Sequence, residues 1–388
     1  MENFKHHIPT IIYFGKGQVA ALEQELKSRA EKVLIVTGQS SIKRYGIFDS
    51  VVSQVKRAGI SFVELSGIQS NPRLKSVYKG IDICRRESVD FILAVGAGSV
   101  IDAAKAIAAG VKYEGDIWDF FEKGISPKEA LPIGCVLTLA ATGSEMNGNA
   151  VITKEDTQRK LALCNPIIRP VFSILDPEYT FTVNSYHTAA GVADIMAHVF
   201  EQYFSHTRSA DVQDRISEAI LKVCVSYGPV VCEKPNDYDA RANILWAGTL
   251  ALNDLIGGGK ETDWSSHRIE HELSAVYDIS HGAGLAIIMP NWMKFVLNEK
   301  TAKKLADYGR NVWLIGDTGT DIDIAKEAIS RTRKFFNSLG LPKNLREAGI
   351  SDEKFKDMAK RAVESYEVLG SFKKLTEDDV VEIFNMSL

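Results

Sequence analysis

The sequence predicts an α/β nucleotide-binding domain followed by an all-helical domain. Two observations lead to this prediction: the apolar pattern changes near residue 185, and 388 residues exceed what one hydrophobic core usually serves. Before that point short β-branched runs alternate with amphipathic segments, whereas after it apolar residues recur at helical spacing. We therefore place two domains, at residues 1–182 and 183–388.

Five runs in the first half have the composition of buried strands. They lie at residues 32–38, 61–65, 91–99, 132–140 and 171–177. Strands that alternate with helices in this way form a parallel, doubly wound sheet. Gly and Pro residues divide the second half into helices, which we predict near residues 187–206, 210–228, 237–255, 263–278, 322–339 and 352–367.

Composition excludes several classes of protein. Hydrophobic residues make up 45% and charged residues 25% of the chain, as in folded globular proteins. A net charge of −4 gives no basic field for nucleic acid, and we expect no such partner. The five cysteines contain no Cys-x-x-Cys pair, and no apolar run has the length of a membrane span or a secretory signal. These features are typical of a cytoplasmic protein that does not bind membranes.

A glycine turn follows the third predicted strand. Gly96, Ala97, Gly98 and Ser99 precede an alanine-rich helix, so backbone N–H groups and the serine hydroxyl can bind a phosphate. The alternative is that the small residues only allow close packing of helix on sheet. Asp102, in the first helical turn, is either part of the same site or a favourable partner of the helix dipole.

The first predicted strand ends in another polar turn, where sheets of this type usually receive the adenosine ribose. Gly38, Gln39, Ser40 and Ser41 include no carboxylate to select NAD, and Lys43 with Arg44 follows closely. Hydroxyls, backbone N–H groups and a cation suit a 2′-phosphate, which predicts that NADP(H) is preferred over NAD(H). If the turn is merely polar, both cofactors are used.

The second half contains a metal-ligand pattern. Asp194 and His198 stand four residues apart, His267 and His271 repeat that spacing, and His281 follows ten residues later. On a helix, residues at this spacing share one face. Three imidazoles and one carboxylate can bind Zn²⁺ or Fe²⁺ and leave room for a substrate oxygen. The alternative is a group of solvated or internally bonded histidines.

At these residues the chain resembles the iron-containing alcohol dehydrogenases, also called group III, and within them the butanol dehydrogenase and aldehyde reductase branch. The glycine turn with Asp102 resembles the family's phosphate loop, with Ala97 in place of the middle glycine. Residues 137–145 resemble its threonine-rich loop, and residues 175–201 its first signature, although Asn184 stands where proline is common and is expected to loosen the start of the helix. The resemblance implies a dehydroquinate synthase-like fold.

The resemblance also implies the roles of individual residues. Asp194, His198, His267 and His281 would bind one divalent metal, Fe²⁺ or Zn²⁺, while His271 would be catalytic as a proton relay or would only orient its neighbours. The predicted cofactor contacts are Gly38, Gln39, Ser40, Ser41, Asn71, Pro72, Gly96, Ala97, Gly98, Ser99, Asp102, Thr138, Ala141, Thr142, Asn147, Lys160 and Tyr179.

The predicted function is NAD(P)H-linked oxidation and reduction of short-chain alcohols and aldehydes such as butanol and butanal, by a homodimer. A polyol dehydrogenase or a lyase on the same fold is the first alternative. Ala, Ile, Met and Trp264 flank the predicted ligands, which favours a small or apolar carbonyl substrate over a multiply charged one. A scaffold protein without activity is the second alternative, and the complete set of predicted ligands argues against it.

Overall fold

The computed structural model describes residues 1–364 and 368–388 and contains two compact units. The α/β unit comprises residues 7–183 and 236–249, and the helical unit comprises residues 1–6, 184–235 and 250–388. Two short segments, 1–6 and 236–249, therefore pack with a unit that chain order alone would not assign to them. Within the described ranges no helix is both long and apolar enough to cross a membrane.

The α/β unit is built on a six-stranded sheet in the order β1-β8-β5-β4-β2-β3. All neighbouring strands in it run parallel. Its strands are β1 (Ile11–Phe14), β2 (Lys32–Thr37), β3 (Ser61–Leu65), β4 (Phe91–Gly96), β5 (Ile133–Leu137) and β8 (Phe172–Leu175). The five predicted runs are confirmed as β2, β3, β4, β5 and β8. Strand β1 and the antiparallel hairpin of β6 (Asn149–Lys154) and β7 (Arg159–Cys164) were not predicted from the sequence.

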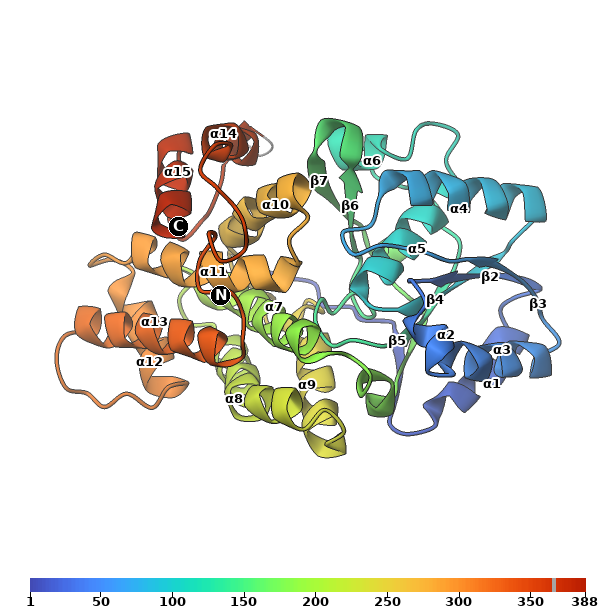
Figure 1. The fold of residues 1–388 in the computed structure, drawn as a ribbon, viewed down its shortest axis with the longest axis horizontal. Coiled ribbons are helices and arrows are strands. Elements are labelled where there is room, and N and C mark those ends of the chain that lie inside the picture. Colours follow the sequence, from blue (N-terminus) through green and yellow to red (C-terminus); the bar gives the residue numbers. More distant parts are fainter. Residues whose placement is uncertain (365–367) are drawn as a thin grey trace. The chain divides into compact units, whose positions relative to one another are not determined.

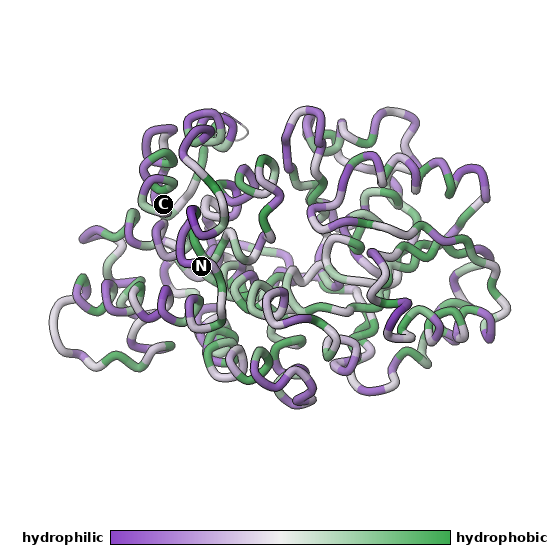
Figure 2. The backbone as a smooth tube through the Cα atoms, in the orientation of Figure 1, coloured by the Kyte–Doolittle hydropathy of each residue, from purple (hydrophilic) through white to green (hydrophobic). Residues whose placement is uncertain are grey.

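Helices cover both faces of this sheet (Figure 1). Leu34 and Val36 of β2 pack toward α4 (Leu74–Glu87) and α5 (Gly98–Val111), while Val33 and Ile35 pack toward α1 (Ala21–Lys27) and α3 (Ile47–Arg57). A strand that buries both of its faces is apolar at nearly every position. The hydropathy colouring accordingly runs green through the central strands (Figure 2). Two short helices, α2 (Ser41–Arg44) and α6 (Asp119–Glu122), lie in the connections.

The helical unit contains the other helices of the described chain. They are α7 (Ser185–Tyr203), α8 (Asp211–Glu233), α10 (Ser265–Tyr277), α11 (His281–Val296), α12 (Ala302–Asn311), α13 (Asp321–Ser338), α14 (Phe355–Glu364) and α15 (Glu377–Met386), while α9 (Tyr238–Ala251) begins in the α/β unit. The six predicted helices are present, although residues 365–367 of the last lie outside the described residues. We missed α11, α12 and α15, the first because it contains two glycines and Pro290.

The expectation that Asn184 loosens the start of α7 is wrong. Its side chain accepts a hydrogen bond from the backbone N–H of His187 at 2.8 Å, so Asn184 caps the helix. Capping by asparagine typically contributes about 1 kcal/mol relative to alanine. The helix that carries Asp194 and His198 therefore begins at a fixed residue.

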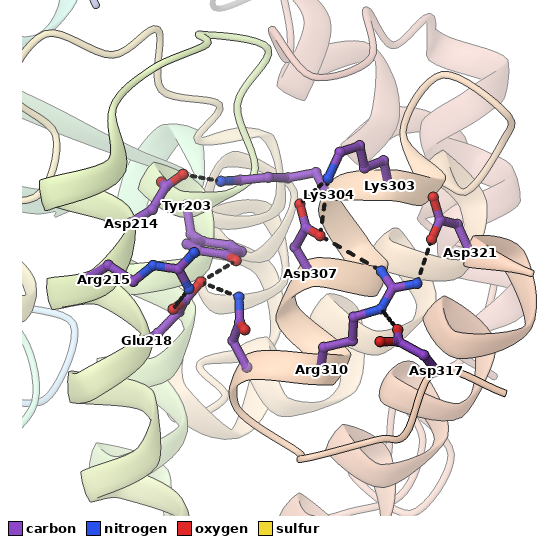
Figure 3. A network of polar contacts seen from close by, with 11 residues as sticks. Tyr203, Asp214, Arg215, Glu218, Lys303, Lys304, Asp307, Arg310, Asp317 and Asp321 are labelled. Atoms are coloured by element: carbon purple, nitrogen blue, oxygen red, sulfur yellow. Dashed lines mark hydrogen bonds and ion pairs between the residues drawn. The ribbon is translucent and has the colours of Figure 1, made fainter.

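A network of ion pairs and hydrogen bonds joins α7, α8 and α12 in the helical unit (Figure 3). Lys260 and Lys304 both contact the Asp214 carboxylate, and Lys260 is nearly fully buried. The Tyr203 hydroxyl donates to Glu218 at 2.8 Å. Every charge in this network has a partner of opposite sign, which is typical of a structural contact rather than a ligand site.

Candidate metal centre and cofactor loops

Three of the four predicted metal ligands converge in the helical unit. Asp194, His267 and His281 each offer a ligand atom, and these atoms lie within 4.8 Å of one another. His281 Nε2 is 3.6 Å from Asp194 Oδ1. His198, one turn after Asp194, lies beside this group with its Nδ1 3.8 Å from Asp194 Oδ1. We call Asp194, His198, His267, His271 and His281 the histidine cluster.

Close helix packing brings these side chains together. A Cβ on Gly282 would lie 1.9 Å from the carbonyl oxygen of Ala190, so α11 begins directly against the backbone of α7. A Cβ on Gly284 would lie 2.6 Å from Glu270 Oε1, so this glycine leaves room for that carboxylate. The two glycines after His281 therefore set its position relative to Asp194, since only glycine permits such close approach.

A buried carboxylate supports each of two histidines. Glu201 Oε1 lies 2.9 Å from His267 Nδ1, and Glu270 Oε2 contacts His281 Nδ1. Both carboxylates are fully buried. When Nδ1 donates its proton to a carboxylate, Nε2 carries the lone pair, and the ring is oriented as a metal ligand. Neither carboxylate was predicted from the sequence, although Glu201 follows Asp194 by two helical turns and Glu270 follows His267 by one.

Glu201 has more than one hydrogen-bond donor. It also accepts bonds from the Ser266 hydroxyl at 2.5 Å and the backbone N–H of Trp264 at 2.7 Å. Burial alone would raise the pKa of Glu201, but the bonds from His267 and Ser266 lower it below its usual value. Glu201 is therefore an anion that holds His267 in one orientation.

Two histidine nitrogens indicate which kind of ligand the cluster suits. Within the described part of the chain, His198 Nδ1 and His267 Nε2 are buried and have no hydrogen-bond partner. Burial, together with the neighbouring His267 and His281, lowers the pKa of His198 well below its usual value. Ring nitrogens without hydrogen-bond partners beside a carboxylate oxygen fit a divalent cation, which imidazole nitrogen and carboxylate oxygen both bind. His271 is partly buried on α10, with its ring centroid 5.3 Å from that of His281.

The predicted cofactor contacts gather after the carboxyl ends of parallel strands in the α/β unit. Residues 38–41 follow β2, residues 97–99 follow β4, residues 138–142 follow β5, and Tyr179 follows β8. Open parallel sheets bind ligands at this edge. The backbone N–H of Thr138 donates to the Gly96 carbonyl at 3.1 Å, which joins two of these loops.

The glycines of the phosphate loop are explained by packing. An added Cβ would lie 2.6 Å from Val100 Cγ2 at Gly96 and 2.3 Å from Thr142 Oγ1 at Gly98. The alternative that small residues permit close packing therefore accounts for these two positions. The same packing puts the Thr142 side chain against the start of α5, where backbone N–H groups are available to an anion.

Four predicted contacts bond to other parts of the α/β unit. Asp102 accepts hydrogen bonds from the Ser144 hydroxyl at 2.6 Å and the Val151 N–H at 3.1 Å. Asn147 Oδ1 accepts from the buried Lys105, and Lys160 Nζ donates to Asn71 Oδ1 at 2.9 Å. The fully buried Lys105 was missed because a lysine inside an alanine-rich helix gives no sequence signal of its partners.

Comparison with known proteins places the chain in a family. Residues 9–177 match the iron-containing alcohol dehydrogenase family, and residues 188–388 match the carboxy-terminal part of the Fe-containing alcohol dehydrogenase family. The chain belongs to the iron-containing alcohol dehydrogenase family and is an oxidoreductase, as the sequence motifs predicted.

Individual relatives cover the whole length of the chain. It is 51% identical to NADH-dependent butanol dehydrogenase A of Clostridium acetobutylicum over 100% of both chains. It is 40% identical to the NADPH-dependent aldehyde reductase YqhD of Escherichia coli over 94% of both. The crystal structure of NADH-dependent butanol dehydrogenase A from Thermotoga maritima superimposes with a TM-score of 0.96 at 39% identity, covering 100% of this chain and 99% of that one. These matches confirm the predicted fold class.

Proposed function

We propose that the protein is a metal-dependent, NAD(P)H-linked alcohol dehydrogenase and aldehyde reductase for short-chain substrates such as butanol and butanal. One observation carries the proposal: ligand atoms of Asp194, His267 and His281 converge within 4.8 Å, while His267 Nε2 is buried without a hydrogen-bond partner among the described residues. The names of the relatives, butanol dehydrogenase and aldehyde reductase, support the same substrate class.

The proposed metal ligands are Asp194, His198, His267 and His281, with Fe²⁺ or Zn²⁺ as the cation. Carboxylate oxygen and imidazole nitrogen suit both ions. A divalent cation bound by these residues supplies Lewis-acid polarisation of the substrate oxygen. Glu201 and Glu270 keep His267 and His281 in the orientation that ligation needs, because each contacts the Nδ1 atom of its histidine.

His271 is proposed to relay a proton between the alcohol oxygen and solvent. It stands one turn after His267 on α10 and is partly buried, so it can face both the cluster and water. Reduction of an aldehyde requires a proton at the oxygen, and a positioned histidine is suited to provide it near neutral pH. The alternative role, in which His271 only orients its neighbours, predicts no change in pH profile when it is replaced.

Metal analysis joined to an assay tests the proposal. The purified protein is treated with a chelator, dialysed, and supplied separately with Fe²⁺, Zn²⁺ or Mn²⁺, and NAD(P)H oxidation with butanal is followed. We expect activity to be lost with the metal and restored by at least one ion, with butanal reduction more efficient than butanol oxidation near neutral pH. Full activity in metal-free protein would overturn the metal role. A preference of more than about tenfold for a polyhydroxylated or phosphorylated substrate would overturn the substrate class.

The cofactor is proposed to bind along the residues at the carboxyl edge of the sheet named above. The prediction that NADP(H) is preferred stays a prediction, and one group in the α/β unit works against it. Glu64 of β3 forms an ion pair with Lys43 at 2.6 Å and accepts a hydrogen bond from Thr37 at 3.4 Å. A carboxylate therefore stands near the turn after β2 and competes with a 2′-phosphate for Lys43.

The ratio of kcat/KM for NADPH over NADH tests this preference. A ratio above one supports the sequence-based prediction, and a ratio well below one rejects it. Glu64→Gln should raise the ratio by freeing Lys43, whereas Lys43→Met should lower it. Gly38→Asp should also lower the ratio, because the added carboxylate would repel a 2′-phosphate. The substitution fits the fold, since a Cβ at Gly38 meets only ordinary contacts at 3.6 and 3.7 Å. Lys27→Met, at an exposed lysine of α1, is the control.

Three further properties are proposed with this function. The domain division is placed after residue 182, as the change of apolar pattern in the sequence favours.

A homodimer is supported by the exposed edge strand β1, where Ile11 is 43% and Phe14 is 38% exposed, because unpaired apolar edges tend to be covered. A cytoplasmic location is proposed from the cysteine pattern.

A further inference from the structure

A fully buried lysine lies beneath the cofactor loops of the α/β unit. Lys105, on α5, donates to Ser144 Oγ at 2.8 Å, Asn147 Oδ1 at 3.1 Å and the Asn149 carbonyl at 2.7 Å. An ammonium group has three protons to donate, and these three acceptors use them all. All three belong to the segment between β5 and the first residue of β6. We call Asp102, Lys105, Ser144 and Asn147 the lysine cluster.

Asp102 completes this contact from the preceding turn of α5. Ser144 receives a hydrogen bond from Lys105 and donates its own proton to Asp102 Oδ1 at 2.6 Å. The other oxygen of Asp102 accepts the Val151 N–H at 3.1 Å. One helix therefore presents a carboxyl group and an amino group to the same segment, residues 144–151.

The segment held in this way begins at the end of the predicted threonine-rich loop, residues 137–145, and is bonded to it. Asn147 Nδ2 donates to the Thr142 carbonyl at 3.3 Å, and the Ser144 N–H donates to Thr142 Oγ1 at 3.2 Å. Thr142 in turn packs on Gly98 at the start of α5. A continuous set of contacts thus runs from Lys105 through Ser144 and Asn147 to Thr142 and back to the phosphate loop.

We propose that Lys105 is a positioning residue that holds the threonine-rich loop and the phosphate loop in one fixed geometry for the nicotinamide cofactor. The inference rests on the proposed function, because it assumes that these loops bind the cofactor. Lys105 acts through Ser144 and Asn147 and does not itself touch the cofactor, since its ammonium protons are all engaged. Asp102, predicted as a cofactor contact, then has the same positioning role.

The chemistry favours positioning over a purely stabilising role. Burying a lysine is costly, and apolar residues of similar size often stabilise a core equally well. Burial lowers the pKa of Lys105 to about 8, although the nearby Asp102 acts in the opposite direction. A charge kept at this cost is well suited to fixing loop geometry, because hydrogen bonds are directional and apolar contacts are not.

The test compares Lys105→Met with Lys112→Met, an exposed lysine at the end of the same helix. The dissociation constants of NADH and NADPH are measured by fluorescence titration, well below the thermal midpoint of each variant. Metal content, kcat and KM with butanal are measured on the same preparations. We expect Lys105→Met to weaken cofactor binding about tenfold or more and to raise the cofactor KM, while kcat at saturating cofactor changes less than threefold and metal content is unchanged. Lys112→Met should match the wild type.

The outcomes separate this inference from the proposed function. If the wild type binds neither cofactor, the proposed function fails. If the wild type binds a cofactor and a folded Lys105→Met protein binds it equally well, within twofold, the positioning role alone is rejected. This holds even when Lys105→Met has a lower thermal midpoint than the wild type. Should Lys105→Met not fold, Ser144→Ala is the second variant, because it removes the shared hydroxyl and leaves Lys105 two acceptors. Unchanged cofactor binding in folded Ser144→Ala also rejects the role, and weaker binding with intact metal content supports it.

Discussion

The histidine cluster and the lysine cluster are both buried and both contain charged or ionisable groups, yet they differ in one respect. In the lysine cluster, Lys105 and Asp102 bond to groups of the same unit. In the histidine cluster, His198 Nδ1 and His267 Nε2 have no hydrogen-bond partner in the described ranges. A buried polar atom without a partner costs about 1–3 kcal/mol. This difference supports our proposals that the histidine cluster binds a metal ion and that the lysine cluster holds the loops around the cofactor.

Removing one imidazole side chain from the histidine cluster should have the strongest effect on metal binding and activity. His267→Ala should abolish metal retention and turnover, because loss of a ligand exceeds the roughly 10- to 100-fold effect typical of groups that only support ligands. Metal content and kcat/KM with butanal are the measurements. His206→Ala is the matched control, since that histidine contacts the Phe372 carbonyl outside the cluster. Stoichiometric metal and a normal rate in His267→Ala would show that His267 is not a ligand. The unpartnered nitrogen would then no longer distinguish the histidine cluster from the lysine cluster.

Replacing His271, on the same helix as His267, should have a smaller effect and should show whether His271 is a metal ligand or a proton relay. His271→Ala should keep the metal and lose roughly 100-fold or more in kcat, the usual contribution of general acid–base catalysis. The pH profile of kcat should change as well, because the group proposed to exchange a proton with the substrate oxygen has been removed. A metal-free His271→Ala protein would instead make His271 a ligand, and an unchanged pH profile would leave it an orienting role only.

Replacing Glu201, whose carboxylate contacts His267 Nδ1, tests whether its negative charge strengthens metal binding. Glu201→Gln keeps an oxygen that can accept from His267 but removes the negative charge, so metal affinity should fall by roughly 10- to 100-fold. The measurement is competition for the metal against a chelator of known affinity. Glu233→Gln, at an exposed position near the end of α8, should behave like the wild type. Equal affinity in Glu201→Gln would limit this residue to a packing role.

The smallest effect concerns the pH dependence contributed by Lys105. Its pKa of about 8 lies below the ordinary 10.5, so between these values the unfolded chain binds the proton more tightly than the folded protein does. Stability from this group therefore rises as pH increases through that window. The charged and titratable groups that influence Lys105 are Asp102, Cys135, Glu145 and Arg169.

The difference in thermal midpoint between the wild type and Lys105→Met should therefore change with pH. It should shift in favour of the wild type by at least about 2 °C from pH 8 to pH 10.5. Lys112→Met should show no such change, since its side chain is exposed. A constant difference across the window would mean that Lys105 titrates in the folded state as an exposed lysine does.

Local periodicity allowed much of the fold to be predicted. The strands that bury both faces, β2, β4, β5 and β8, appear as continuous apolar runs, because packing on both sides excludes polar residues. Edge strand β1 and the β6–β7 hairpin were missed, since they are short or only partly buried and lack that signal. Helix α11 was missed because Gly282, Gly284 and Pro290 resemble helix breakers, whereas the glycines are needed for contact with Ala190 and Glu270.

Residue spacing was enough to predict which members of the histidine cluster share a helix face, because a spacing of four residues is a local property of the helix. Packing in three dimensions was needed to show which carboxylates contact His267 and His281. The same is true of the bond between Asp102 and Ser144 and of the ion pair between Lys43 and Glu64. These partners are distant along the chain, and spacing carries no information about them. Their choice depends on how closely helices and strands pack, which is fixed by contacts such as that of Gly282 with Ala190.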